Sequence, residues 1–166
     1  MDVKSFADAA LFRSLYGEAC DAEEIEPFLE YAGRVLSTAV TGVDGVDKLE
    51  TAPPEGSSAE AVGVCICAIA DALFRIREAG KLADAARTLT ETDVGLRGGV
   101  IASMSAGNEY VTYRSFPDGL SVYERASSDP RFRAQLLYGI VREHLSGVRD
   151  KNGVRLLYMG AYPAFV

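Results

Sequence analysis

The sequence contains no tryptophan, one histidine, three cysteines and no hydrophobic run long enough to cross a bilayer. A membrane-spanning helix needs about 20 consecutive apolar residues, whereas the longest apolar run, residues 61–74, is interrupted by Asp71. The first twenty residues carry Asp2, Asp8 and Glu18, which a secretory signal peptide would not carry. We therefore expect an intracellular protein that does not associate with a membrane.

The few cysteine and histidine residues limit the chemistry that the chain can perform. Cys20, Cys65 and Cys67 are odd in number and lack the spacing of a disulfide framework. On a helix, Cys65 and Cys67 would point about 200° apart, so they could not hold one metal ion on one face. We therefore interpret both as small buried hydrophobic residues. The single imidazole, His144, is predicted to lie on the surface or at a helix end, where its charged form is stabilised.

The net charge of −7 is distributed unevenly along the chain. Residues 1–31 contain eight acidic and two basic residues (net −6), whereas residues 125–155 contain three acidic and seven basic residues (net +4). An acidic protein is disfavoured as a reader of nucleic acid or as a binder of anionic membranes. The two segments are either ordinary solvated surface or complementary patches that meet head to tail between subunits.

Apolar residues make up 48% of the chain, which is enough to bury a core and excludes wholesale disorder. Their spacing predicts a mainly α fold in a single domain over residues 1–166. The expected helices cover residues 4–16, 22–38, 59–79 and 131–145. A loop rich in proline and glycine is expected over residues 40–58.

The two longest predicted helices differ in how much of their surface is apolar. Residues 22–38 carry one apolar stripe and begin after Asp21 in a sequence typical of a capping box. Residues 59–79 are apolar at most positions, so we expect burial nearly all round this helix and an end at Gly80. Residues 81–92 have a composition compatible with a helix but weak periodicity.

The segment that follows predicts a β-hairpin in an otherwise helical chain. Two short runs of strand-forming residues, near 100–104 and 109–114, flank a Ser-Ala-Gly-Asn turn. A lone hairpin is marginally stable in water, so we expect it to pack on helices or on another subunit. The predicted partner-binding residues are Ser103, Ser105, Gly107, Asn108, Tyr110 and Tyr113.

Other candidate sites lack the patterns that their chemistry requires. The acidic residues 21–26 lack the 12-residue loop of an EF-hand. The glycine-rich residues 95–99 lack both a P-loop pattern and a strand–loop–helix context. Ser103 or Ser105 could act as a nucleophile only with His144 as the base. We therefore expect no catalysis, no cofactor and no metal.

At the hairpin the sequence resembles one family. Residues 103–113 read Ser-Met-Ser-Ala-Gly-Asn-Glu-Tyr-Val-Thr-Tyr. This segment is similar to the Ser-x-Ser-x-Gly-x-x-x-Val-Ser-Tyr-like hairpin of the head–tail connector, or head-completion, proteins of long-tailed bacteriophages and prophages. The resemblance extends in order to the family's opening helix, first long helix, central helix, and closing helix with its tail, at residues 12–17, 25–36, 61–76 and 133–160. Two departures, the long loop at 40–58 and the extended turn at 150–152, leave the ring size open.

This resemblance implies a small bundle of three to four helices with a protruding β-hairpin. Family members assemble as a ring, typically of about a dozen copies, under the portal of the virion. The ring joins head to tail and extends the DNA channel. Its implied partners are other copies of the chain, the portal protein, and a tail-completion or stopper protein, while DNA passes without sequence-specific binding. The implied location is the virion, and the host bacterial cytoplasm during assembly.

Two further hypotheses remain open at the level of sequence. One is a small helical protein-binding or regulatory module without catalysis, which would be monomeric or dimeric. The other is an enzyme that uses Ser103 or Cys65 as a nucleophile.

Overall fold

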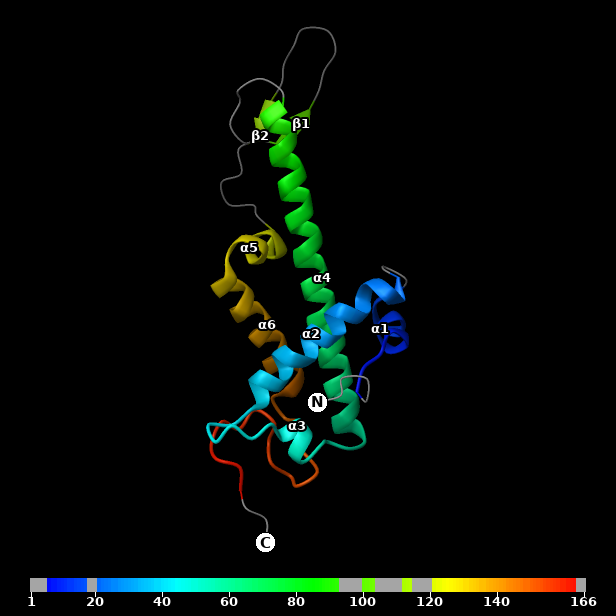
Figure 1. Cartoon of the computed structure of the whole chain (residues 1–166), viewed down its shortest axis with the longest axis vertical. Coiled ribbons are helices and arrows are strands. Elements are labelled where there is room, and N and C mark those ends of the chain that lie inside the picture. Colours follow the sequence, from blue (N-terminus) through cyan, green and yellow to red (C-terminus); the bar gives the residue numbers. More distant parts are fainter. Residues whose placement is uncertain (1–5, 18–20, 93–99, 104–111, 115–120, 164–166) are drawn as a thin grey trace. The chain divides into compact units, whose positions relative to one another are not determined.

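The computed structural model describes residues 6–17, 21–92, 100–103, 112–114 and 121–163, with side chains described outside residues 86–120 (Figure 1). The helices are α1 (Ala9–Tyr16), α2 (Ala22–Val40), α3 (Lys48–Thr51), α4 (Ser57–Thr92), α5 (Val122–Ser128) and α6 (Pro130–Leu145). The strands are β1 (Val100–Ser103) and β2 (Thr112–Arg114). The prediction of a mainly α fold is confirmed.

Contacts divide the chain into two compact units, and the divisions fall within α4 and α6. The first unit contains Met1–Phe74 and Ala134–Val166, and the second contains Arg75–Arg133. The single domain expected over residues 1–166 stays a prediction.

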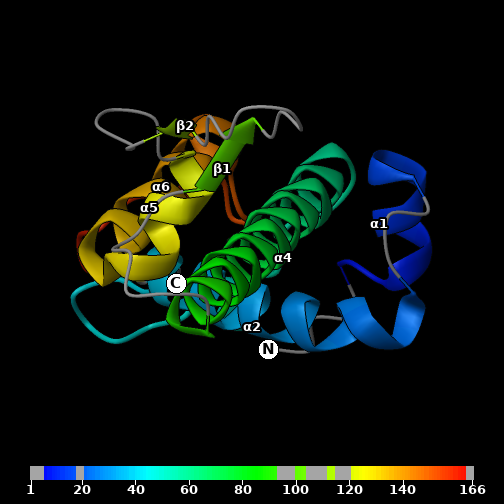
Figure 2. The ribbon, with the colours of Figure 1, turned by 90° about the horizontal axis from the view of Figure 1, so that it is seen from above.

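The first unit is built on α2 and the N-terminal half of α4. Asp8 caps the start of α1, where its carboxylate accepts a hydrogen bond from Leu11 N at 2.8 Å, and Gly17, with φ in the left-handed region, caps the end. Figure 2 shows α1 beside the N-terminal end of α2. The large buried side chains include Phe12, Ile25, Leu29, Leu36, Val40, Val62, Ile66, Ile69, Leu137, Val141, Leu145 and Leu156. The buried side chains of α6, and those of α2 together with Ala32, recur every three or four residues. Each helix therefore buries one stripe, as predicted for residues 22–38.

Helix α4 is buried nearly all round in its N-terminal half, which confirms the prediction. From Val62 to Leu73 no side chain is exposed. Gly63 is required here because a Cβ would overlap the carbonyl oxygen of Phe6 and lie 3.1 Å from Leu11 Cδ2. The N-terminal segment therefore packs directly on the backbone of α4.

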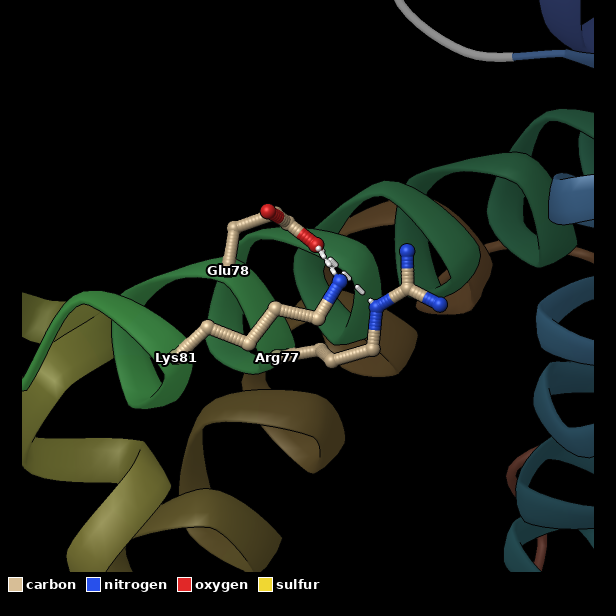
Figure 3. A network of polar contacts seen from close by, with 3 residues as sticks. All are labelled: Arg77, Glu78 and Lys81. Carbon is tan, nitrogen blue, oxygen red and sulfur yellow. Dashed lines mark hydrogen bonds and ion pairs between the residues drawn. The ribbon is translucent and has the colours of Figure 1, made fainter. Parts of the chain in front are cut away.

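The predicted helix end at Gly80 is wrong, because α4 continues to Thr92. A glycine that ends a helix usually adopts a left-handed conformation, and Gly80 has no positive φ. Its neighbours favour the helix, and a charged cluster precedes and spans it (Figure 3). Glu78 Oε1 accepts from Lys81 Nζ at 2.8 Å and from Arg77 Nε at 3.2 Å. These hydrogen bonds lower the pKa of Glu78, with Lys81 as the main cause.

The helices α3 and α5 were not predicted, so the described residues contain more than the expected three to four helices. Both are short and depend on local caps rather than on periodicity. Asp47 Oδ1 accepts from Leu49 N at 2.9 Å at the start of α3. Ser121 and Glu124 form a reciprocal capping box at the start of α5. By contrast, Asp21 occupies the cap position of α2 but its side chain makes no capping hydrogen bond.

In the second unit, arginine side chains organise α5 and the start of α6. Arg133 donates to the carbonyl oxygens of Ala126 and Ser127, at 2.9 and 3.0 Å. It thereby supplies hydrogen bonds to carbonyl groups at the end of α5 that lack a partner within the helix. Arg75 lies over the ring of Tyr123, 5.8 Å from its centroid. The first contacts join α6 to α5, and the second joins α5 to the second half of α4.

The strands β1 and β2 also belong to the second unit and pair antiparallel. Val100 faces Arg114, Ile101 faces Tyr113, and Ser103 faces Thr112. Ala102 is the extra residue of a bulge between the last two pairs. The connecting residues 104–111 lie outside the described part of the chain, so a protruding hairpin stays a prediction.

Candidate functional site

The predicted partner-binding residues are only partly covered by the described structure. Ser103 ends β1 and Tyr113 lies in β2, on neighbouring rungs of the same ladder. The other four, Ser105, Gly107, Asn108 and Tyr110, lie outside the described residues. The pairing of β1 with β2 therefore brings together the two ends of the predicted site.

A second arrangement, which sequence reasoning missed, centres on a buried lysine in the first unit. Lys48, the first residue of α3, is fully buried. Its ammonium group donates to the carbonyl oxygens of Val40 at 2.8 Å, Leu156 at 3.1 Å, and Tyr158. One side chain thus joins the end of α2 to a chain segment more than one hundred residues away. No sequence pattern marks such a contact, because Lys48 looks like an ordinary loop lysine.

The electrostatic setting of Lys48 combines burial with nearby carboxylates. Burial lowers the pKa of Lys48, and the charges of Asp44, Asp150 and Asp47 partly oppose this shift. Buried charges need partners, and the three carbonyl oxygens supply the hydrogen bonds. The result is a fixed junction between α3 and the C-terminal segment.

Asp150 and Tyr162 close this junction from the C-terminal side. Asp150 is buried, and its Oδ1 accepts from the backbone N–H groups of Asn152 and Val154, both at 2.9 Å. Its Oδ2 accepts from the hydroxyl of Tyr162. Burial and the hydrogen bond to Asp150 raise the pKa of Tyr162. The turn after α6 is therefore ordered by one carboxylate.

The carboxylate of Asp44 binds the backbone of the same segment, and this hydrogen bond predicts a pH dependence. Asp44 Oδ2 accepts from Tyr162 N at 2.6 Å, and this bond is the main cause of the lowered pKa of Asp44. Because the pKa of Asp44 in the folded state lies below the ordinary value of 3.8, this hydrogen bond stabilises the folded state fully above that pH. It is lost as the pH falls through the lowered pKa. We expect the amide proton shift of Tyr162 in NMR spectra to titrate below pH 3.8 in the wild type and not in Asp44→Asn. An unchanged titration in the variant would contradict this assignment.

The junction presents apolar side chains to solvent. Val43 is 78% exposed, Tyr158 49% and Met159 48%. Val43 N donates to the carbonyl oxygen of Met159 at 3.2 Å, and this hydrogen bond holds Val43 and Met159 side by side. Lys151 and Arg155 are exposed on the same segment. We call Val43, Lys151, Arg155, Tyr158 and Met159 the tail surface.

The two described cysteines are chemically quiet. Cys65 and Cys67 are fully buried in α4, as predicted. Burial raises the pKa of Cys65 to about 12 and that of Cys67 to about 11. Both thiols are therefore protonated at neutral pH, which disfavours Cys65 as a nucleophile.

This burial predicts slow thiol modification. With Cys20 replaced by serine, we expect both remaining thiols to react with a disulfide reagent at pH 8 at least about a thousandfold more slowly in the native protein than in urea. The measurement is the absorbance change on labelling. Rapid labelling of the native protein would show that α4 opens locally.

Residues 6–17, 21–92, 100–103, 112–114 and 121–163 contain no cluster of His, Cys, Asp and Glu suited to a metal ion. Over the same residues, no helix is long and apolar enough to cross a membrane. Comparison with protein-family models, curated proteins and solved structures finds no match.

Proposed function

We propose that the chain is a structural virion subunit that assembles as a ring under the portal of a long-tailed phage, joins head to tail and extends the DNA channel. The observation that carries the proposal is the antiparallel β1–β2 pair, placed between α4 and α5 in a mainly α chain. This element occurs where the sequence resembles the connector hairpin. The order of α1, α2, α4 and α6 also follows the order of the resemblance.

The physical properties of a two-stranded sheet support a role in contact with another chain. Such a sheet is marginally stable alone, and its edges offer unpaired N–H and C=O groups to a third strand. Ser103, Ser105, Gly107, Asn108, Tyr110 and Tyr113 are the residues proposed to contact neighbouring subunits or the portal. The net charge of −7 suits a channel through which DNA passes, because phosphates are held by Lys and Arg.

The direct test is to look for the chain in phage particles. Virions are purified after prophage induction of the cell that carries this gene and are labelled with an antibody against the chain. We expect labelling at the neck, between head and tail. Particles that lack the chain would contradict the proposal. A purified chain that also remains monomeric and does not bind the portal protein would favour a helical binding module.

A charged residue at Tyr113 should weaken docking. A tyrosine in the centre of an interface contributes about 2 kcal/mol or more, so Tyr113→Asp should lower docking affinity for the portal by about 30-fold. In complementation, unjoined heads and tails should accumulate. The control is Tyr138→Asp, at an exposed tyrosine of α6, which should keep normal titres. Normal joining of heads and tails in Tyr113→Asp would exclude the strand pair as the joint.

A further inference from the structure

We propose that copies of this chain join head to tail, with the tail surface of one copy seated on the acidic face of α2 of the next. We define this acidic face by the exposed residues Glu23, Glu30 and Tyr31. The inference deepens the proposed ring and rests on it. It names the two surfaces that would make the contact between neighbouring subunits.

The tail surface has the properties of a prepared binding site. Its three apolar side chains, Val43, Tyr158 and Met159, are about half exposed or more, and exposed apolar clusters on soluble proteins mark interaction sites. They are also held in place. Lys48 donates to the carbonyl oxygen of Tyr158, and Val43 N donates to that of Met159 at 3.2 Å. A surface that is ordered before binding loses less conformational entropy on association.

The charge of the tail surface is positive. Lys151 and Arg155 are exposed, and Arg149 is exposed beside them, with a hydrogen bond from its Nη1 to the carbonyl oxygen of Gly153 at 2.6 Å. Asp150 is buried, and its carboxylate oxygens are occupied by backbone N–H groups and the Tyr162 hydroxyl. Asp44 is exposed nearby but accepts hydrogen bonds from Tyr162 N and Val46 N. The accessible charge is therefore mainly cationic.

The acidic face of α2 has the opposite charge. Glu23 and Glu30 are seven residues apart, so they lie on the same side of the helix. Tyr31 is 49% exposed beside Glu30 and adds apolar area. Arg34 is exposed four residues after Glu30 and lies on the same side of the helix, so this face carries two carboxylates and one guanidinium group. The tail surface and the acidic face are thus opposite in net charge, and each has an exposed tyrosine.

These surfaces lie too far apart to neutralise each other within one copy. Lys48 ties the tail segment to Val40, the last residue of α2. Along that helix, Glu23 and Glu30 lie roughly 25 and 15 Å from Val40 at 1.5 Å per residue. Figure 1 shows the N-terminal end of α2 beside α1 and the other end near α3. Both separations exceed the Debye length of about 8 Å at physiological salt. The charges can therefore pair between copies.

A contact between these two different patches can be heterologous. Such a contact joins each copy to the next and closes into a ring when the rotation per subunit permits. A two-fold dimer would instead have to make this contact twice, with each tail surface seated on the acidic face of the other copy. Species larger than a dimer in sedimentation would therefore distinguish a chain or ring of subunits from a two-fold dimer.

The test is a charge swap measured by analytical ultracentrifugation. The first variant is Glu23→Lys with Glu30→Lys, and the second is Lys151→Glu with Arg155→Glu. At about 50 mM salt the wild type should self-associate, and about 0.5 M salt should weaken this. Each variant alone should lose at least about tenfold in affinity. An equimolar mixture should associate again, and so should the chain that carries all four substitutions. Circular dichroism checks that each variant is folded.

The matched control is Glu55→Lys with Glu60→Lys, which changes the net charge by the same amount at exposed positions near the start of α4. It should associate like the wild type. The inference is overturned if the wild type is monomeric up to about 1 mM at low salt. It is also overturned if the variants associate normally alone, or if the mixture fails to associate.

The outcome also separates this interface from the proposed function. If the chain is found at the neck of virions and the charge variants still assemble there, the ring role stands and this interface falls. If charge-dependent association occurs but the chain is missing from virions, the interface stands and the virion role falls.

Discussion

Replacing Lys48 by methionine should destabilise the first unit by about 3 kcal/mol. Methionine fills similar space but cannot donate to the carbonyl oxygens of Val40, Leu156 and Tyr158. A buried acceptor that loses its donor costs about 1–3 kcal/mol, and the relief of burying a charge offsets part of this loss. The measurement is the free energy of unfolding in urea, followed by circular dichroism.

A second readout locates the effect of this substitution. Hydrogen exchange should increase at residues 156–159, because their connection to α3 is lost. The control is Lys81→Met at an exposed lysine of α4, which should change the free energy of unfolding by no more than about 0.5 kcal/mol. A loss below about 1 kcal/mol in Lys48→Met would show that the junction is held by apolar packing instead.

Alanine at Gly63 should destabilise the protein by about 2 kcal/mol although alanine favours helices. The new Cβ would overlap the carbonyl oxygen of Phe6, which is backbone and cannot swing aside like a side chain. Overpacking of this kind costs about 1–3 kcal/mol or more. As the N-terminal segment moves away from α4, Phe12, which is 1% exposed, also loses burial. The combined loss exceeds the gain of about 1 kcal/mol in helix propensity.

The same substitution at Gly80 gives a matched control of opposite sign. Gly80 lies in the same helix, but a Cβ there would be 3.6 Å from Ser127 Cβ, an ordinary contact. We expect Gly80→Ala to raise the free energy of unfolding by up to about 1 kcal/mol. Equal effects of the two substitutions in urea denaturation would show that the Phe6 contact does not matter.

The parts of the fold that sequence could predict are those with a periodic apolar pattern. The stripes of α2 and α6 and the all-round burial of α4 follow from residue spacing alone. The end predicted at Gly80 is wrong because a glycine usually ends a helix where its backbone adopts a left-handed φ, and sequence does not determine φ. The short helices α3 and α5 depend on single capping side chains, which occur in many loops.

The candidate sites, too, could be predicted only where the signal is local in the sequence. Local sequence could propose strands near 100–104 and 109–114, and β1 and β2 lie within these ranges. The bulge at Ala102 depends on the pairing of two strands and has no local signal. The Lys48 junction could not be predicted from local sequence, because it joins Lys48 to Leu156 and Tyr158, which lie 108 and 110 positions later in the chain. Contacts at such separation are determined by tertiary packing.

The Lys48 junction has a consequence for synthesis on the ribosome. By the time residue 145 has been translated, every helix described in the structure has been made. The ammonium group of Lys48 still lacks two of its three acceptors, because Leu156 and Tyr158 have not yet emerged. Final closure of the first unit must therefore wait until Tyr158 has been translated, and a nascent chain stalled before that residue would expose its core to chaperones and proteases.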